Sequence, residues 1–212
     1  MININVFFDK LGDNNREKKY NYLISFFNPT LETKIIDVGA SEKEYRLTAN
    51  ILEKRFLCPH NIKVLGVDKY ETFIKRYPSV KVVTYDGGIF PFGDNEFDLC
   101  WCNAVIEHVG GIDKQREFLK EIKRVAKHAF VTTPNRFFPV ELHTKVFLLH
   151  FLPKKLFDWF LLKIGKSWAT KEYVHLLGGR QIIKLLKDCG ILDYKIIKNK
   201  LSGFIVDYMI IF

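Results

Sequence analysis

Hydrophobic runs and amphipathic stretches alternate along the first two thirds of the chain. Short apolar runs of strand length are separated by segments whose apolar residues recur every three to four positions, as they do in a helix packed on one face. Strands that alternate with helices predict a parallel sheet joined by right-handed crossovers. The expected strands are residues 34–38, 62–67, 80–84, 97–102 and 129–133, and the expected helices are residues 16–27, 42–55 and 71–76 and a segment from Phe118 to Ala126.

The remaining third has a different pattern. Residues 137–177 mix aromatic and aliphatic side chains with lysines, which predicts a helical insertion that acts as a lid over the site. The elements expected after it are a helix over residues 181–189 that ends at Gly190, and two strands, 193–198 and 204–212, joined by a Ser202-Gly203 turn.

These elements predict one α/β domain over residues 1–212. Its sheet is expected to be doubly wound, mostly parallel and seven-stranded, with a C-terminal antiparallel hairpin. The helical insertion follows the fifth strand.

Three of the expected strands have an aspartate at or just after their C-terminal end. Asp37, Asp68 and Asp86 each follow an apolar run, and ligands of open α/β sheets bind outside the carboxyl ends of the strands. Gly39 lets the backbone turn close to a ligand, and the N-terminus of the helix expected next would attract a carboxylate. The pattern indicates a nucleoside site at this edge of the sheet. Asp86-Gly87 is also a common turn pair, so a purely structural role for Asp86 is the alternative.

Composition and charge restrict the kinds of partner, site and compartment that we expect. The 212 residues are 48% hydrophobic, so we expect a full core. The formal net charge of +9 suits an anionic partner such as nucleic acid, phospholipid or a phosphorylated substrate, and a basic surface that is merely solvated is the alternative. No Cys/His cluster has the spacing of a zinc site, and we expect no metal. The chain shows neither a signal peptide nor an apolar run of the roughly 20 residues that span a bilayer. This predicts a cytoplasmic protein, with buried, reduced thiols at Cys100 and Cys102.

Together these motifs resemble the class I S-adenosylmethionine-dependent methyltransferases, within their broad small-molecule (type 11-like) group. The resemblance covers residues 30–135 and is carried by residues 35–40 with Asp68, by Pro91-Phe92 with residues 94–99 and 106–109, and by residues 133–136. The chain departs from the family in the first loop. Three glycine-like positions are usual there, and this chain has Gly39, Ser41 and Lys43.

The resemblance implies S-adenosylmethionine as the cofactor. Asp68 would accept hydrogen bonds from both ribose hydroxyls, Asp86 would accept one from the adenine amino group, and Asn103 and Ala104 would lie under the methionyl group. The missing Gly-x-Gly-x-x-Gly pattern and the long separation of Asp68 from the glycine loop argue against NAD. The full set implied for the cofactor is Asp37, Gly39, Ala40, Ser41, Asp68, Lys69, Asp86, Gly87, Asn103, Ala104 and His108.

Methyl transfer requires few catalytic groups. Methyl transfer from a sulfonium is an in-line displacement on an activated donor, so catalysis consists largely of positioning in a dry site. A hydroxyl acceptor would also profit from a general base. The candidates are His108, Glu141 and His143, with His175 as a fourth, and an ordinary structural role is the alternative for each.

The favoured function is methyl transfer to a small-molecule acceptor such as a sugar, a lipid-linked glycan or another lipid-like substrate. Lysines among aromatic residues in the segment 145–168 also favour contact with a membrane surface. One alternative is an RNA methyltransferase, which the charge of +9 favours, although residues 103–106 lack the prolines of base N-methyltransferases. The others are a cofactor-binding protein without catalysis, which the altered glycine loop favours, and, least favoured, a nicotinamide dehydrogenase.

Overall fold

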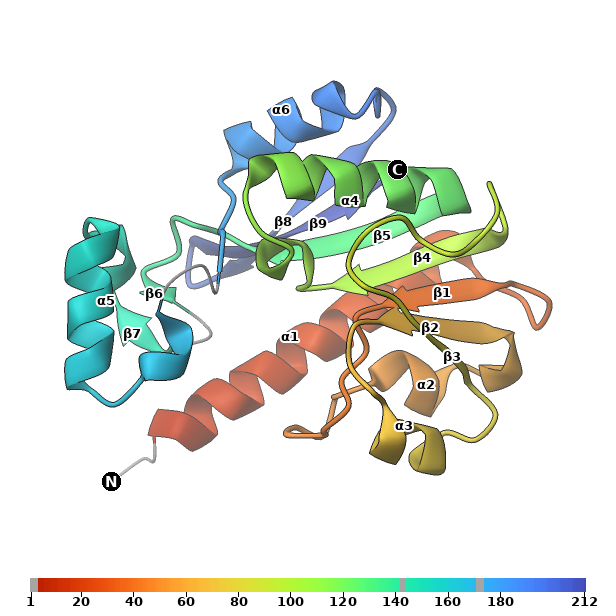
Figure 1. The fold of residues 1–212 in the computed structure, drawn as a ribbon, viewed down its shortest axis with the longest axis horizontal. Coiled ribbons are helices and arrows are strands. Elements are labelled where there is room, and N and C mark those ends of the chain that lie inside the picture. Colours follow the sequence, from red (N-terminus) through yellow and green to blue (C-terminus); the bar gives the residue numbers. More distant parts are fainter. Residues whose placement is uncertain (1–3, 142–143, 171–173) are drawn as a thin grey trace. The chain divides into compact units, whose positions relative to one another are not determined.

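The structure is a computed structural model, which describes residues 4–141, 144–170 and 174–212. The chain divides into two compact units, a first unit of residues 1–103 and 121–130 and a second unit of residues 104–120 and 131–212. Helix α4 (Ile112–Val125) and strand β5 (Ala126–Pro134) each begin in one unit and end in the other. Seven strands form one sheet in the order β3-β2-β1-β4-β5-β9-β8 (Figure 1). This is the mostly parallel sheet that the sequence predicts.

The first unit holds the parallel strands β1 (Ile35–Val38), β2 (Ile62–Gly66), β3 (Lys81–Thr84) and β4 (Phe97–Asn103). All four residues of β1 are buried, as expected for a parallel strand with partners on both sides and covered faces. Ile35 is in register with Ile62 of β2 and with Leu99 of β4, so the carboxyl ends of these strands meet at one edge. The helices of this unit are α1 (Ile4–Phe27), α2 (Ile51–Arg55), the 3₁₀ helix η1 (Pro59–Asn61) and α3 (Glu71–Arg76).

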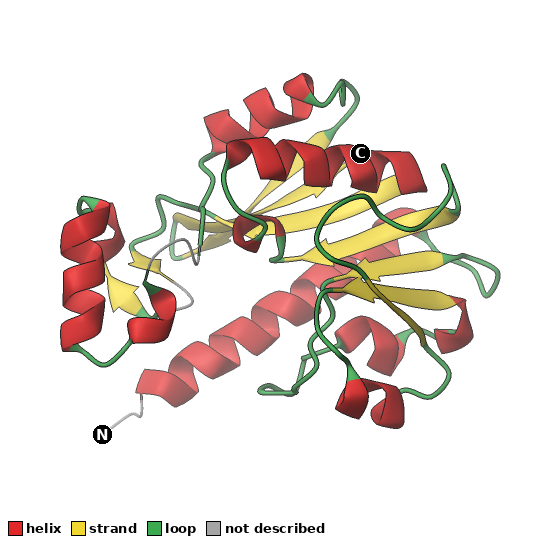
Figure 2. Cartoon of the chain, in the orientation of Figure 1, coloured by secondary structure: helices red, strands yellow, loops and turns green. Residues whose placement is uncertain are grey.

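The predicted helix over residues 42–55 is wrong for most of its length. Only α2 is helical, and Figure 2 shows loop through most of the segment between β1 and α2. The Asn50 side chain accepts a hydrogen bond from the Ser41 N–H at 2.8 Å and donates one to the Ser41 carbonyl at 2.9 Å. These bonds close a loop, and Tyr45 within it is 81% exposed. Local side-chain bonding by asparagine therefore outweighs the helical periodicity here.

The second unit contains the C-terminal hairpin that the sequence predicts. β8 (Lys195–Leu201) pairs antiparallel with β9 (Phe204–Ile211). Ser202 and Gly203 between them have φ angles of 47° and 88°, as a tight hairpin turn requires. Helix α6 (Gly179–Asp188) precedes the hairpin and is followed by the predicted glycine, Gly190, with a φ angle of 67°.

The insertion after β5 contains a small sheet that the sequence does not reveal. β6 (Val140–Glu141) and β7 (Val146–Phe147) pair antiparallel, and each is only two residues long, which is too short for a readable alternation. The expected helix follows as α5 (Lys154–Lys163). The 3₁₀ helices of this unit are η2 (Ile106–His108), η3 (Leu149–Phe151) and η4 (Ser167–Ala169).

The other predicted elements are present with shifted ends. The first helix begins at Ile4 rather than at residue 16, and β5 begins at Ala126, directly after α4. Cys100 and Cys102 are fully buried in β4, as predicted. Within the described ranges no helix has the length and apolarity that a bilayer span needs. The single-domain organisation and the lid role of residues 137–177 stay predictions.

Candidate functional site

Two hollows open at the carboxyl ends of the strands in the first unit, where the sequence predicts the nucleoside site. We call them the β1 hollow, of about 160 Å³, and the β2–β3 hollow, of about 510 Å³. Seven of the predicted cofactor residues line them: Asp37, Gly39, Ser41 and Asn103 the β1 hollow, and Asp68, Lys69 and Asp86 the β2–β3 hollow. The fold therefore brings most of the predicted set to one edge of the sheet.

Four predicted cofactor residues do not line these hollows. Ala40 is buried, and its carbonyl oxygen accepts a hydrogen bond from the Tyr70 hydroxyl at 2.8 Å. Gly87 is exposed and follows Asp86 with a φ angle of 92°. Ala104 and His108 belong to the second unit, and His108 is exposed. Cofactor contacts by these four residues stay predictions.

Gly39 makes the turn expected of it. Its φ angle of 87° lies in the region that favours glycine, and its N–H donates a hydrogen bond to the Leu65 carbonyl at 2.8 Å. No helix begins in the following loop, so the predicted helix N-terminus that would attract a carboxylate is absent from the described structure. Positively charged side chains are present there instead: Arg16, Lys43 and Arg46 line the β1 hollow.

Arg16 is the cation that the sequence reasoning missed. It comes from α1, and burial chiefly lowers its pKa, with Arg46 acting in the same direction and Asp13 and Asp37 in the opposite one. Arg46 is already paired with Asp9, at 3.2 Å from Nη2 to Oδ1. Arg16 therefore supplies positive charge beside Asp37 at the point where the helix N-terminus was expected. A basic residue on the helix that leads into the first strand is the signal that could have found it.

Asp37 belongs to a buried pair of carboxyl groups. Its side chain is 4% exposed and that of Glu53 from α2 is 5% exposed. Burial is the main cause that raises the pKa of Asp37, the neighbouring Glu53 raises it further, and Arg16 opposes the shift. Burial likewise raises the pKa of Glu53. Two such groups hold one proton between them more easily than two negative charges.

Asp68 and Asp86 are in the opposite situation, because both are exposed in the β2–β3 hollow. The Asp86 carboxylate accepts a hydrogen bond from the Gly88 N–H at 3.1 Å, so the turn role considered for this residue is real. The Asp68 carboxylate has no hydrogen-bond or ion-pair partner in the described part of the chain. Its oxygens are therefore available to hydroxyl donors of a ligand.

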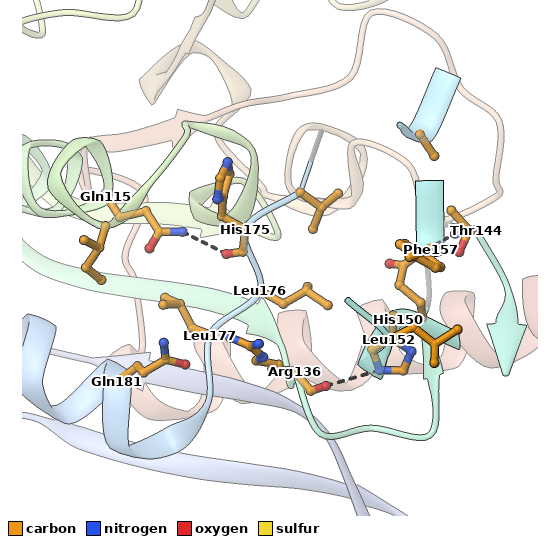
Figure 3. A pocket seen from close by; sticks show the side chains of 14 residues that line it. Gln115, Arg136, Thr144, His150, Leu152, Phe157, His175, Leu176, Leu177 and Gln181 are labelled. Atoms are coloured by element: carbon orange, nitrogen blue, oxygen red, sulfur yellow. Dashed lines mark hydrogen bonds between the residues drawn. The ribbon is translucent and has the colours of Figure 1, made fainter. Parts of the chain in front are cut away.

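A third cavity, of about 390 Å³, lies within the second unit, and we call it the second-unit pocket (Figure 3). Two of the predicted bases, Glu141 and His175, line it, whereas His108 does not. His143 lies outside the described residues. The apolar wall of the second-unit pocket includes Leu152, Phe157, Leu176 and Leu177. The polar groups of the pocket include Gln115, Arg136, Glu141, His150, His175 and Gln181.

The backbone of His175 is fixed on both sides. Its N–H donates to the Glu107 carbonyl at 2.7 Å, and its carbonyl accepts from the Gln115 side chain at 2.9 Å, the contact drawn as a dashed line in Figure 3. The Nε2 atom of the ring is buried and has no hydrogen-bond partner among the described residues. An imidazole nitrogen of this kind can accept a proton from a bound ligand.

Three other polar groups shape the pocket. One Glu141 carboxylate oxygen accepts hydrogen bonds from the N–H of Thr144, at 2.6 Å, and from its hydroxyl. Burial lowers the pKa of His150, which favours the neutral ring, and its Nε2 donates to the Arg136 carbonyl at 3.2 Å. The Arg136 guanidinium is exposed and unpaired within the described ranges, so it can meet an anionic group. Sequence reasoning did not single out His150 or assign a role to Arg136.

Comparisons with known proteins agree with this geometry. Residues 44–129 match a family model described as a methyltransferase domain. An S-adenosylmethionine-dependent methyltransferase from Methanosarcina mazei is 16% identical, with a TM-score of 0.52 over 89% of this chain and 95% of that chain. One from Aquifex aeolicus is 15% identical, with a TM-score of 0.56 over 97% and 96%. Magnesium protoporphyrin IX methyltransferase (ChlM) from Synechocystis PCC 6803, solved with bound S-adenosylhomocysteine, is 12% identical, with a TM-score of 0.60 over 100% and 87%.

No curated protein matches the chain in sequence. The likeness to the solved structures establishes the fold, and the matched family model adds the kind of domain. Both agree with the resemblance drawn from the sequence motifs. Residues 44–129 therefore match a methyltransferase domain, and the chain has the fold of these S-adenosylmethionine-dependent methyltransferases.

Proposed function

We propose that the protein transfers a methyl group from S-adenosylmethionine, bound at the two hollows of the first unit, to a small-molecule acceptor bound in the second-unit pocket. The observation that carries the proposal is the set of aspartates at the carboxyl ends of β1, β2 and β3, which line open hollows as the sequence predicts. Ligands of open α/β sheets bind at this edge. The β1 hollow, at about 160 Å³, is smaller than a typical ligand site, so the cofactor extends over both hollows.

Each end of the cofactor has a chemical match in the first unit. Asp68 accepts hydrogen bonds from the ribose hydroxyls, and Asp86 accepts one from the adenine amino group. Arg16, with Lys43, binds the methionyl carboxylate in the β1 hollow, where no helix N-terminus is available. Carboxylate and guanidinium groups form strong, charge-assisted hydrogen bonds, which compensates for the missing glycines of the first loop.

The second-unit pocket favours an acceptor with an apolar body and a polar or anionic group. Leu152, Phe157 and Leu176 offer apolar contact, and Arg136 offers a cation. A lipid-like acceptor, or a sugar carried on a lipid, has both features. A fully polar free sugar would leave the apolar wall unused.

The transfer step needs one proton acceptor when the acceptor atom is a hydroxyl oxygen. The oxygen–methyl bond forms as the sulfur–methyl bond breaks, the cofactor leaves as the neutral thioether S-adenosylhomocysteine, and the hydroxyl proton passes to a base. We assign that role to His175, because its Nε2 is buried and has no partner among the described residues. Glu141 is tied to Thr144 through one of its oxygens and holds the pocket wall in place.

The reducing cytoplasm is the compartment that we propose for this reaction. All four cysteines are free, and three of them are buried. Free thiols are usual where glutathione keeps cysteines reduced. Cell fractionation with an antibody to the chain tests this, and recovery from an oxidising compartment would contradict it.

Calorimetric titration with S-adenosylmethionine, S-adenosylhomocysteine and NAD tests the cofactor. We expect heats of binding for the first two and none for NAD, and binding of NAD alone would contradict the proposal. Formation of S-adenosylhomocysteine in the presence of a panel of lipid-linked and free sugars then tests the acceptor. Binding without turnover of any acceptor would favour the cofactor-binding alternative.

A further inference from the structure

We propose that residues 145–164 of the second unit form a docking face for an anionic phospholipid surface, which we call the membrane face. The segment concentrates large apolar side chains that point to solvent. Those at least 41% exposed are Phe147, Leu148, Phe151, Leu152, Leu156, Trp159, Leu162 and Ile164. Exposed apolar residues scattered singly are ordinary, but a concentration of this kind in one segment indicates a contact surface.

Helix α5 is apolar on two sides, and only one of them is covered. Leu161 is fully buried and packs with Val146 and Ala169, and Phe157 and Phe160 are packed against this cluster. On the other side, Leu156, Trp159 and Leu162 follow one another at three-residue spacing and are 54%, 58% and 58% exposed. Residues three apart lie on the same side of a helix, so these side chains form one apolar strip that no element of the described residues covers.

The charges that the sequence gives this segment point to the kind of partner. Residues 145–166 contain five lysines, at 145, 154, 155, 163 and 166, and one acidic residue, Asp158. The Lys163 ammonium lies 5.8 Å from the centre of the Trp159 ring, which keeps the cation next to the apolar strip. Anionic headgroups above an apolar layer are complementary to this arrangement. The core of a protein–protein interface is by contrast depleted in lysine.

The length of α5 decides how it would meet the bilayer. Its ten residues span about 15 Å at a rise of about 1.5 Å per residue. This is half of the roughly 30 Å of a hydrocarbon core. The helix is therefore suited to lie in the headgroup region with Trp159 at the interface, rather than to cross the bilayer.

The membrane face also adjoins the second-unit pocket. Leu152 belongs to the face and lines the pocket, and Phe157 of α5 lines it as well. If the proposed function holds, a lipid-linked acceptor can pass from the bilayer into the pocket along apolar side chains. This step rests on the proposed function, whereas binding to the membrane does not.

Co-sedimentation of the full chain with vesicles tests the proposal. We expect binding to vesicles that contain phosphatidylglycerol, weaker binding to pure phosphatidylcholine, and release by high salt. The double variant Trp159→Ser/Leu162→Ser should lower the partition coefficient by about tenfold or more. Leu192→Ser, at a residue of the same unit that is 78% exposed but lies outside the face, should bind as the unchanged protein does.

The outcomes separate this proposal from the proposed function. Both variants should have the same far-ultraviolet circular dichroism spectrum and the same affinity for S-adenosylmethionine as the unchanged protein. Absence of binding to every vesicle, or equal binding by the double variant, overturns the membrane face. A dimer in light scattering that the double variant abolishes, with no vesicle binding, would assign the strip to self-association instead. Failure to bind S-adenosylmethionine with intact vesicle binding would overturn the proposed function alone.

Discussion

The hollows of the first unit and the pocket of the second unit differ in the kind of wall they present. Charged groups dominate the hollows, with Asp68 and Asp86 at one and Arg16 and Lys43 at the other. Apolar side chains make up half of the residues that line the second-unit pocket, and polar side chains make up the other half. A ligand with a nucleoside and a zwitterionic end fits the first kind of wall, and an amphiphilic ligand fits the second. Substitutions should therefore affect cofactor affinity in one unit and turnover in the other.

The largest effect that would sharpen this contrast is expected at His175. Asparagine at this position cannot take the proton, so kcat should fall by about 100-fold, within the range that general-base catalysis contributes. The affinity for S-adenosylmethionine should not change. Initial rates of S-adenosylhomocysteine formation at saturating acceptor measure the effect, and His60→Asn, at an exposed histidine of the first unit, is the matched control. An unchanged kcat would remove His175 from the chemistry.

Asp68→Ala should produce the next largest effect. This substitution should change only the binding of S-adenosylmethionine. Loss of hydrogen bonds between a carboxylate and two hydroxyls should raise the Kd for S-adenosylmethionine by about 10- to 100-fold. Calorimetric titration measures this, with Asp193→Ala as a control at another exposed aspartate. An equal Kd for the variant and the unchanged protein would mean that the ribose is held elsewhere.

The loop between β1 and α2 gives an intermediate effect. Asn50→Ala removes both bonds to Ser41 and should lower the free energy of unfolding by about 1–2 kcal/mol, together with cofactor affinity. Urea denaturation measures the stability. Asn50 has a φ angle of 51°, a conformation that glycine adopts without strain and alanine does not. Asn50→Gly therefore separates the contribution of the side-chain bonds from that of the backbone conformation, because it loses the bonds only. If Asn50→Gly is as stable as the unchanged protein, the side-chain bonds contribute nothing.

The smallest effect concerns the buried pair of Asp37 and Glu53. Burial raises the pKa of Glu53 in the folded protein. Above that pKa the buried side chain is ionised, which lowers the free energy of unfolding. This loss of stability disappears as the pH falls below the pKa of the unfolded chain, about 4.3. Glu53→Gln should therefore raise Tm by about 2–4 °C at pH 7.5 and by less near pH 4. Thermal melts at both pH values measure this, with the exposed Glu32→Gln as a control. A Tm lowered at pH 7.5 would mean that the charged form is stabilised where it lies.

The contrast between the units also explains how much could be predicted from the sequence. Asp37, Asp68 and Asp86 were found because each closes an apolar run, and strand ends fix where such residues lie. The seven-stranded sheet and the hairpin around Ser202-Gly203 were predicted for the same reason, since period and turn chemistry are local. The segment 42–50 shows the limit, because the side-chain bonds of Asn50 to Ser41 hold a loop where the sequence predicted a helix.

The second-unit pocket could be predicted only in part. Arg136, His150, His175 and Gln181 come from segments far apart in the sequence, and no spacing rule connects them. Glu141 and His175 were considered because acids and imidazoles can act as bases, and chemistry alone gave no reason to prefer them over His108. A pocket made from separate loops depends on tertiary packing, which one sequence does not display.

A crystal structure of the protein with S-adenosylhomocysteine tests the central claim most directly. We predict that the ribose hydroxyls lie within hydrogen-bond distance of Asp68, the adenine next to Asp86, and the methionyl carboxylate at Arg16. Adenosine bound away from the carboxyl ends of β2 and β3, or hollows closed by the protein's own side chains with no ligand bound, would contradict the account.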